Sequence, residues 1–183
     1  MDAEELTWIE RAQEGDAWAF EQLVRRYEQR LLGLVCDIAG SLEDGQDVYQ
    51  EALIAAYRAL PRYRGESAFY TWLYRIGVNR ALRFRQQKRR WAALQVEETA
   101  VDSTGKVEGP EEALLAAECR QQVQGALERA SPQERAAFAL CHHQGFKITE
   151  AAAMMDCSSG TVKSYLFRAR SKVKAALAAY MEA

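Results

Sequence analysis

The stretch KITEAAAMMDCSSGTVKSYLFRARSKVKAAL, residues 147–177, has the spacing of a helix-turn-helix. A first helix is expected over residues 148–155, followed by a turn in which the small Cys157 can fill the corner between helices. Ser158 or Ser159 can cap the second helix. The apolar residues of this second helix recur at steps of four, three and four and predict one buried stripe: Val162, Leu166, Ala169 and Val173.

The other faces of this second helix display donors and cations without a single acid. Lys163, Ser164 and Arg168 can reach base edges in a major groove, and the Phe167 ring can contact a thymine methyl. A surface helix with solvated cations is the alternative, but no acid is present to relieve the repulsion between like charges. We therefore predict that the helix reads duplex DNA through these residues: Ser159, Thr161, Lys163, Ser164, Phe167, Arg168 and Arg170.

Most of the remaining chain has helical periodicity, and no segment alternates as a half-buried strand would. Residues 93–111 lack an apolar stripe and combine glycine, proline and acids, which is typical of a flexible linker. We therefore predict an all-α fold of two small helical domains joined by a flexible acidic linker. The expected limits are residues 1–92 for the N-terminal domain, 93–112 for the linker and 113–183 for the helix-turn-helix domain.

Helix limits in both domains follow from capping residues, glycine and proline. The sequence SPQE, residues 131–134, joins an N-cap serine, a proline at the first helical position and a capping-box glutamate. A helix is expected to begin there and to end at Gly145. The N-terminal helices are expected over residues 3–14, over residues 17–39 after a cap at Asp16, from a cap at Asp44 to Pro61, and from Ser67 to residue 91.

Charge is distributed unevenly, although the formal net charge is only −2. Residues 1–57 carry thirteen acids against four arginines, whereas residues 62–90 carry nine cations against Glu66 alone. Residues 160–174 carry five cations and no acid. Two cationic surfaces on an acidic body predict contact with a polyanion at two places.

The segment YRGESAFYTWLYRIGVNRALRFRQQKRR, residues 63–90, interleaves aromatic rings with cations. Single strands expose their base faces, and stacking on an aromatic ring contributes roughly 1–3 kcal/mol per base, so this composition suits melted DNA. Phe69, Trp72 and Ile76 keep the spacing of a core stripe, and Trp72 fits packing as well as stacking. Asn79 can read a base edge or remain a solvated amide. The rings expected to be accessible are Tyr63, Tyr70 and Tyr74.

Composition excludes several classes of protein. The chain has 183 residues, of which 49% are hydrophobic, and no apolar run approaches the roughly 20 residues that span a bilayer. The acidic start is unlike a secretory signal, so we expect the protein in the cytoplasm. The motif CHHQ, residues 141–144, could suggest a metal site, but adjacent side chains diverge on a helix, so no metal or cofactor is expected. The cysteines expected to be buried, reduced thiols are Cys36, Cys119, Cys141 and Cys157.

Three blocks, in this order, resemble the extracytoplasmic-function (group 4) family of bacterial RNA polymerase sigma factors, especially its envelope-stress branch. They are DVYQEALIAAYRAL at residues 47–60, SAFYTWLYRIGVNRAL at residues 67–82 and GTVKSYLFRAR at residues 160–170. The resemblance implies a protein that binds core RNA polymerase and directs it to promoters. It would read the −35 element as duplex and the −10 element as melted DNA.

The resemblance also implies roles for particular residues. The helix at residues 47–60 would dock on the clamp helices of the polymerase β′ subunit through Asp47, Gln50 and Glu51. The helix-turn-helix domain would rest on the β flap, and the linker would run toward the RNA exit path. The loop at residues 63–67 would capture a flipped base of the −10 element. The implied −10 contacts are Tyr63, Arg64, Ser67, Tyr70, Trp72, Arg75, Asn79, Arg80 and Arg83.

Control and location follow from the same resemblance. Family members are held by anti-sigma factors, often anchored in the membrane, so such a partner and retention at the inner membrane are implied. No enzymatic activity and no small-molecule substrate are implied.

Two other functions are alternatives to this reading. A conventional helix-turn-helix regulator would use its N-terminal domain to bind a ligand or dimerise, which leaves the aromatic and cationic segment unexplained. A nuclease would need clustered carboxylates or histidines to hold metal ions. The acids here are scattered, and the histidines are only His142 and His143.

Overall fold

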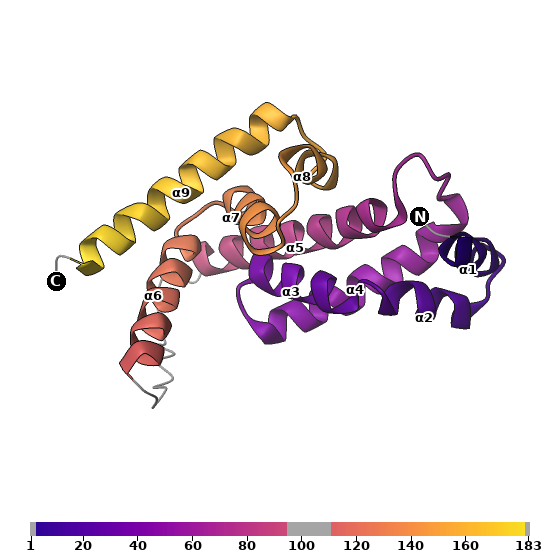
Figure 1. Cartoon of the computed structure of the whole chain (residues 1–183), viewed down its shortest axis with the longest axis horizontal. Coiled ribbons are helices and arrows are strands. Elements are labelled where there is room, and N and C mark those ends of the chain that lie inside the picture. Colours follow the sequence, from indigo (N-terminus) through magenta and orange to yellow (C-terminus); the bar gives the residue numbers. More distant parts are fainter. Residues whose placement is uncertain (1–2, 95–110, 182–183) are drawn as a thin grey trace.

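The computed structural model describes residues 3–94 and 111–181, and within these it consists of helices and turns with no strand (Figure 1). The all-α prediction is confirmed. Residues 95–110, most of the predicted linker, lie outside the described residues. The helices of the N-terminal domain are α1 (Ala3–Gln13), α2 (Ala17–Arg25), α3 (Glu28–Ala39), α4 (Leu42–Ala59), the 3-10 helix η1 (Leu60–Arg62) and α5 (Phe69–Leu94). Those of the C-terminal domain are α6 (Glu111–Glu128), α7 (Pro132–Phe138), the π-helical η2 (Ala139–His143), α8 (Ile148–Met154) and α9 (Ser159–Met181).

The break between α1 and α2 is the one that the sequence predicts. Gly15 has a φ of +100°, a left-handed conformation that favours glycine. The Asp16 side chain accepts a hydrogen bond from the Ala19 amide at 3.1 Å and so caps α2. That bond and the Arg11 guanidinium at 2.6 Å hold the pKa of Asp16 below its usual value.

The expected single helix over residues 17–39 is wrong, because the chain breaks it into α2 and α3 at Arg26 and Tyr27. Both side chains reach α1. The Tyr27 hydroxyl donates to Glu5 at 2.6 Å, while the Arg26 guanidinium pairs with Glu4 at 2.5 Å. These tertiary contacts anchor the break, and helical periodicity along one segment contains no information about them.

The start of α4 also differs from expectation. The N-cap is Ser41, whose hydroxyl accepts from the Asp44 amide at 3.2 Å, whereas Asp44 lies in the first turn and pairs with Lys88 of α5 at 2.5 Å. At Gly45 the helix passes so close to α3 that a Cβ atom would overlap the Sγ of Cys36. Glycine therefore permits this close packing of α3 against α4.

The helix-turn-helix forms as predicted. The Ser131 hydroxyl and the Glu134 carboxylate make the reciprocal bonds of a capping box at the start of α7. The turn after α8 places Asp156 at a φ of +52°, and the Ser158 hydroxyl accepts from the Thr161 amide at 3.1 Å to begin α9. Along α9 the predicted stripe faces inward: Val162, Leu166 and Ala169 are buried and Val173 is half-buried.

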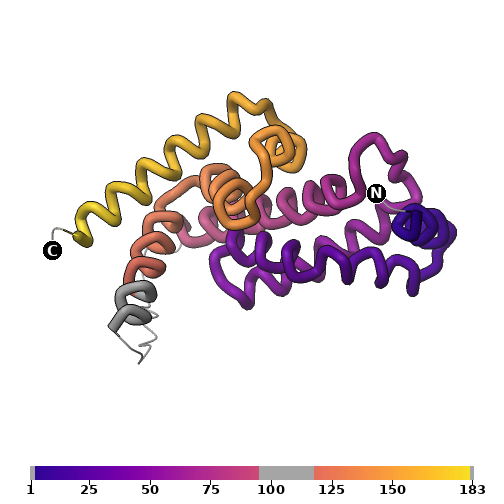
Figure 2. The backbone as a smooth tube through the Cα atoms, viewed as in Figure 1, coloured from indigo at the N-terminus to yellow at the C-terminus, as the bar shows by residue number. Residues whose placement is uncertain are grey.

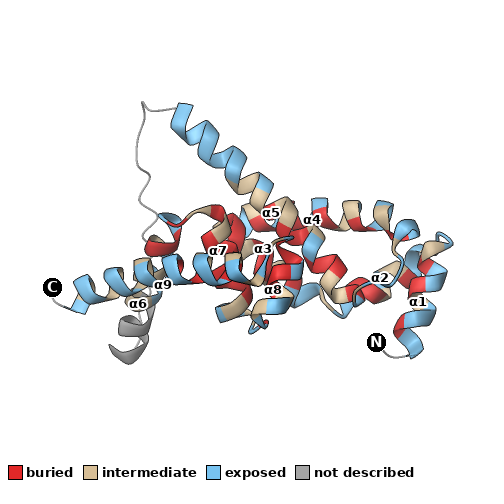
Figure 3. Ribbon diagram, turned by 90° about the horizontal axis from the view of Figure 1, so that it is seen from above, coloured by how far each residue is buried: buried red, intermediate tan, exposed pale blue. Residues whose placement is uncertain are grey.

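The two domains pack against each other, and their contact is a feature that the sequence pattern does not predict (Figures 1 and 2). The segments α7, η2 and α8 lie on α3 and α5, and one hydrophobic core continues through this contact. Figure 3 shows buried residues where α7 and α8 meet the N-terminal domain, whereas the ends of α5 and α9 are mostly exposed. This contact decides which of the candidate binding residues are free.

Candidate nucleic-acid interface

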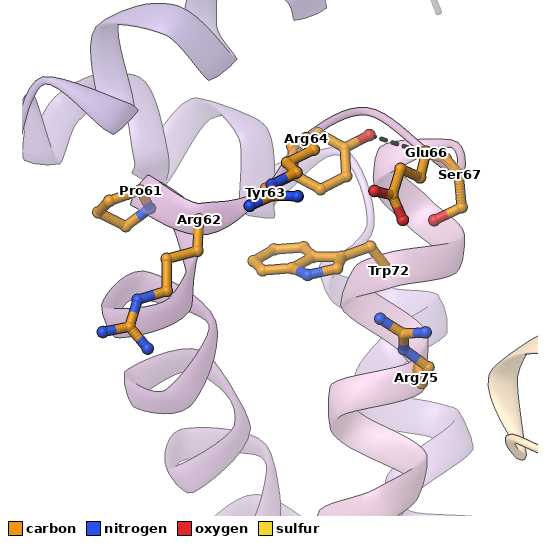
Figure 4. A pocket seen from close by; sticks show the side chains of 8 residues that line it. All are labelled: Pro61, Arg62, Tyr63, Arg64, Glu66, Ser67, Trp72 and Arg75. Carbon is orange, nitrogen blue, oxygen red and sulfur yellow. Dashed lines mark hydrogen bonds between the residues drawn. The ribbon is translucent and has the colours of Figure 1, made fainter.

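A cavity of about 790 Å³ opens where the chain leaves η1 and enters α5 (Figure 4). Its loop is fixed from two sides. The Tyr63 hydroxyl donates to the Ser67 carbonyl at 2.6 Å, and the Gln13 side-chain amide of α1 donates to the carbonyls of Leu60 and Tyr63 at 3.1 and 2.8 Å. The residues lining the cavity are Pro61, Arg62, Tyr63, Arg64, Glu66, Ser67, Trp72 and Arg75.

The cavity combines a stacking surface with cations. The rings of Tyr63 and Trp72 lie with their centroids 5.2 Å apart, and Phe69 packs behind both of them. In Figure 4 the side chains of Arg62 and Arg75 flank the Trp72 indole from two different helices. Such an arrangement can hold an unstacked base against rings while guanidinium groups hold the backbone phosphates.

Five of the predicted −10 residues therefore meet in one cavity: Tyr63, Arg64, Ser67, Trp72 and Arg75. Trp72 is only 8% exposed, so it serves the core and the cavity wall together. Arg80 lies at 3.8 Å from Glu51 of α4, a residue predicted to contact polymerase. Asn79, Arg80 and Arg83 follow further along α5 and do not line this cavity.

Tyr70 and Tyr74 depart from expectation, because the C-terminal domain covers that side of α5. Tyr74 is 1% exposed, so its predicted accessibility is wrong, and burial raises its pKa to about 12. Tyr70 is half-buried, and its hydroxyl donates to Glu150 of α8 at 2.8 Å. The ring of Tyr70 stacks on Phe146, which also belongs to the C-terminal domain. In this arrangement the Tyr70 hydroxyl is taken by Glu150 and one face of its ring by Phe146.

Three residues of the cavity were missing from the predicted set: Pro61, Arg62 and Glu66. Arg62 and Glu66 border the predicted loop directly, so their charge and adjacency were the available signal. Glu66 is exposed and is the only acid among three arginines.

The predicted polymerase contacts lie on an open face of α4. Asp47, Gln50 and Glu51 are all exposed. A shallow groove of about 440 Å³ continues from Glu51 along the same face, past the half-exposed Ile54, and reaches Arg62, which also lines the cavity beside α5. The packing of the two domains against each other therefore leaves this face of α4 uncovered.

The predicted duplex-reading face of α9 is exposed. Lys163, Ser164, Phe167, Arg168 and Arg170 are exposed, whereas Ser159 and Thr161 are half-buried in the first turn. Phe167 exposes 72% of its surface, so its ring is open to a partner. The Arg170 guanidinium turns away from the rest, because its Nε donates to the His142 imidazole at 2.8 Å.

The two histidines and the four cysteines have defined surroundings. His142 accepts from Arg170 while His143 pairs with Asp37 at 2.8 Å, so the two adjacent imidazoles diverge as expected. The cysteines are free thiols as predicted but are half-buried rather than fully buried. Burial raises the pKa of Cys36, Cys141 and Cys157. Across the described ranges, no helix is both long enough and apolar enough to cross a bilayer.

Two family models match this chain: Sigma-70 region 2 over residues 23–91 and Sigma-70, region 4 over residues 120–173. The chain is 38% identical over 177 residues to the RNA polymerase sigma-H factor of Pseudomonas aeruginosa, covering 92% of this chain and 91% of that one. It is 43% identical over 172 residues to the ECF RNA polymerase sigma-E factor of Escherichia coli K12, covering 90% of each.

Two solved structures are similar along most of the chain. The structure of CnrH in complex with the cytosolic domain of CnrY has a TM-score of 0.67 at 27% identity, covering 97% of this chain and 99% of that one. The sigma factor RpoE of Bartonella quintana, in complex with the anti-sigma factor NepR, has a TM-score of 0.65 at 23% identity, covering 86% of this chain and 96% of that one. At 23% identity, the similarity to RpoE shows a shared fold only.

Proposed function

The chain belongs to the extracytoplasmic-function family of RNA polymerase sigma factors, and we propose that it recruits core polymerase to promoters through two separate DNA surfaces. Members of this family are transcription initiation factors rather than catalysts. In this proposal the chain carries out no reaction of its own and acts in the cytoplasm.

The observation that carries the proposal is the chemical difference between the two surfaces. The cavity beside α5 offers paired rings and guanidinium groups, which suit the unstacked bases of a melted −10 strand. The exposed face of α9 offers Lys163, Ser164 and Arg168 beside Phe167, which suit the base edges and thymine methyls of a duplex −35 element. One chain that reads paired and parted strands is what promoter opening requires.

Within the cavity, we assign stacking to Tyr63 and Trp72 and phosphate contact to the arginines at its rim. Asn79 and Arg83 continue the surface along α5, where the single strand would leave the cavity. Tyr70 would join these contacts only after the C-terminal domain has moved, because Glu150 and Phe146 hold it in the closed arrangement.

The matched regions support the division into domains over residues 1–92 and 113–183 with a linker over 93–112. We propose that the linker spans the polymerase surface toward the RNA exit path, where its acids suit a channel built for RNA. The C-terminal domain would rest on the β flap.

Polymerase binding is proposed for the exposed face of α4. Asp47, Gln50 and Glu51 point outward there, and Ile54 provides an apolar centre beside them. A polar rim around a half-exposed apolar residue is typical of protein interfaces. The clamp helices of the β′ subunit are the proposed partner.

We also propose control by an anti-sigma factor. The structurally similar RpoE of Bartonella quintana was solved with the anti-sigma factor NepR. Large apolar side chains remain exposed here on both domains, among them Ile54, Phe167 and Met181. A partner that covers them would block polymerase and promoter together, and a membrane-anchored partner would retain the chain at the inner membrane.

The test is transcription by purified core polymerase with and without this chain on a fragmented genomic library, followed by sequencing of the transcript starts. Addition of the chain should create a new set of start sites that share two sequence elements. A set of start sites unchanged from core polymerase alone would refute the proposal.

A pair of variants separates polymerase binding from DNA reading. Gln50→Ala should weaken core binding while leaving the two sequence elements unchanged. Glu43→Gln, an exposed change in the first turn of the same helix, is the control and should bind core as the wild type does. A shifted promoter preference in Gln50→Ala would instead place this face on DNA.

A further inference from the structure

The loop that borders the cavity beside α5 is held by a helix from another part of the N-terminal domain. Gln13, the last residue of α1, donates from its side-chain Nε2 to the Leu60 carbonyl at 3.1 Å and to the Tyr63 carbonyl at 2.8 Å. An amide nitrogen carries two hydrogens, so one side chain serves both acceptors. The described residues that line the cavity come from η1, the loop after it and α5, so Gln13 acts on the cavity from outside its wall.

The two carbonyls that Gln13 binds lie at the two ends of η1. The Tyr63 amide donates to the Leu60 carbonyl at 2.9 Å and closes the turn of this 3-10 helix. Tyr63 itself is extended, with a ψ of 122°, so its own carbonyl lies beyond the hydrogen-bonding pattern of the helix. Gln13 therefore fixes the point at which the chain leaves η1 and enters the loop.

The tip of this loop is not wedged in place by packing. Gly65 has a φ of +73°, and a Cβ built there would meet nothing within 4 Å beyond its chain neighbours. The position of the loop therefore depends on Tyr63, which is fixed at two points. Gln13 holds its carbonyl, and its hydroxyl donates to the Ser67 carbonyl at 2.6 Å (Figure 4).

The helix that carries Gln13 is itself anchored. Ile9 and Ala12 of α1 are buried in the main hydrophobic core. The buried Glu5 accepts a hydrogen bond from the Tyr27 hydroxyl at 2.6 Å, at the break between α2 and α3. A donor on an anchored helix holds the loop before any DNA arrives, so the loop is ordered on folding rather than on binding.

We infer that Gln13 is a positioning residue of the −10 surface, which holds the Tyr63 ring against Trp72 and thereby sets how strictly the cavity selects its base. This inference rests on the proposed function. Gln13 contacts no base itself and acts through the carbonyls of Leu60 and Tyr63. Without its two bonds, the Tyr63 ring would occupy the stacking position for a smaller fraction of the time, and apparent affinity falls with that fraction.

The test uses Gln13→Met, which keeps an unbranched side chain of similar helix propensity and removes both donors. The full-length chain, assembled with core polymerase, is titrated with single-stranded −10 oligonucleotides that carry each of the four bases at each position in turn. Affinity for the preferred base should fall by about fivefold at one position, the equivalent of one average hydrogen bond. Binding to core polymerase and to the −35 duplex should stay at the wild-type level. The control is Gln29→Met, the same exchange at an exposed position of α3, which should change none of these quantities.

A double variant shows whether Gln13 acts through the ring of Tyr63. Because Tyr63→Leu already lacks the ring, adding Gln13→Met to it should weaken oligonucleotide binding no further. Two independent effects would multiply instead. A general loss of stability would lower affinity in both backgrounds and would also reduce binding to core polymerase.

Circular dichroism shows whether Gln13→Met keeps its helices. If it loses them, Gln13→Glu decides, since it keeps the shape of the side chain, turns a carboxylate toward the two carbonyls and should cause the same loss of selectivity. The role of Gln13 is overturned by a folded variant with wild-type selectivity, by a loss spread evenly over all positions, or by effects that multiply with Tyr63→Leu. A wild-type complex with core polymerase that shows no base selectivity on these oligonucleotides would refute the proposed function instead.

Discussion

Replacing Tyr63 by leucine removes one of the two rings that we propose form the stacking wall of a −10 cavity. Tyr63 faces Trp72 at 5.2 Å and Phe69 at 5.9 Å, so its ring is held in place before any base arrives. Leucine keeps much of the volume and loses the flat surface. The loss of one stacked base is worth roughly 1–3 kcal/mol, which corresponds to binding that is about 5- to 150-fold weaker.

Tyr63→Phe separates the ring from the hydroxyl. It retains stacking but loses the 2.6 Å bond to the Ser67 carbonyl that closes the loop. A hydrogen bond of this kind contributes about 0.5–1.5 kcal/mol, so Tyr63→Phe should bind about 2- to 13-fold more weakly than wild type. The expected order of affinity is therefore wild type, then Tyr63→Phe, then Tyr63→Leu.

The assay is fluorescence anisotropy of a labelled −10 non-template oligonucleotide with core polymerase and each variant. Trp18→Leu, a change of an exposed ring on α2, is the control and should bind as the wild type does. If Tyr63→Leu binds as tightly as Tyr63→Phe while both keep their helical content, Tyr63 does not stack on a base.

Three further predictions test other parts of the molecule. Arg168→Ala should weaken binding to the −35 duplex by about 1–3 kcal/mol, and equal losses on promoter and random DNA in a competition assay would reduce Arg168 to a phosphate contact. The bond to Asp37 raises the pKa of His143 against the opposing effects of burial and the Arg135 charge, so closure should be fully supported below the ordinary histidine pKa and weaken as pH rises through the raised value. Scattering at pH 6 and pH 8 should show this opening in the wild type, and its persistence in His143→Gln would exclude His143 as the cause. Ser131→Ala should lower the free energy of unfolding by about 1 kcal/mol in urea titrations, since it removes the hydroxyl of the capping box, and an unchanged midpoint would contradict that role.

Local sequence rules predict the parts of the fold that local contacts determine. The capping box at Ser131 and the α9 stripe through Val162 and Leu166 form as expected, because each depends on residues within one or two turns. The cap of α4 shows the limit of such rules: Ser41 and Asp44 are both good caps, and the pairing of Asp44 with Lys88 of α5 accompanies the choice of Ser41.

The candidate site is predictable where one loop supplies it. Tyr63, Arg64 and Ser67 are neighbours in sequence and meet in the cavity as the motif indicates. Tyr70 and Tyr74 are not predictable in this way. Their burial depends on Phe146 and Glu150, which lie more than seventy residues away in the sequence. The periodicity of α5 alone cannot predict these contacts.

The two hydrogen bonds from Gln13 link the loop of the proposed DNA cavity to α1, a helix that precedes the residues matched to region 2. The match to region 2 begins at residue 23, yet α1 supplies the amide that braces the loop from below. Trimming the chain to the matched region would therefore preserve every arginine and ring of the cavity while removing its support. Without α1, the carbonyls of Leu60 and Tyr63 would lose these two donors, and the position of the cavity loop would rest on the Tyr63–Ser67 bond alone among the hydrogen bonds described for it.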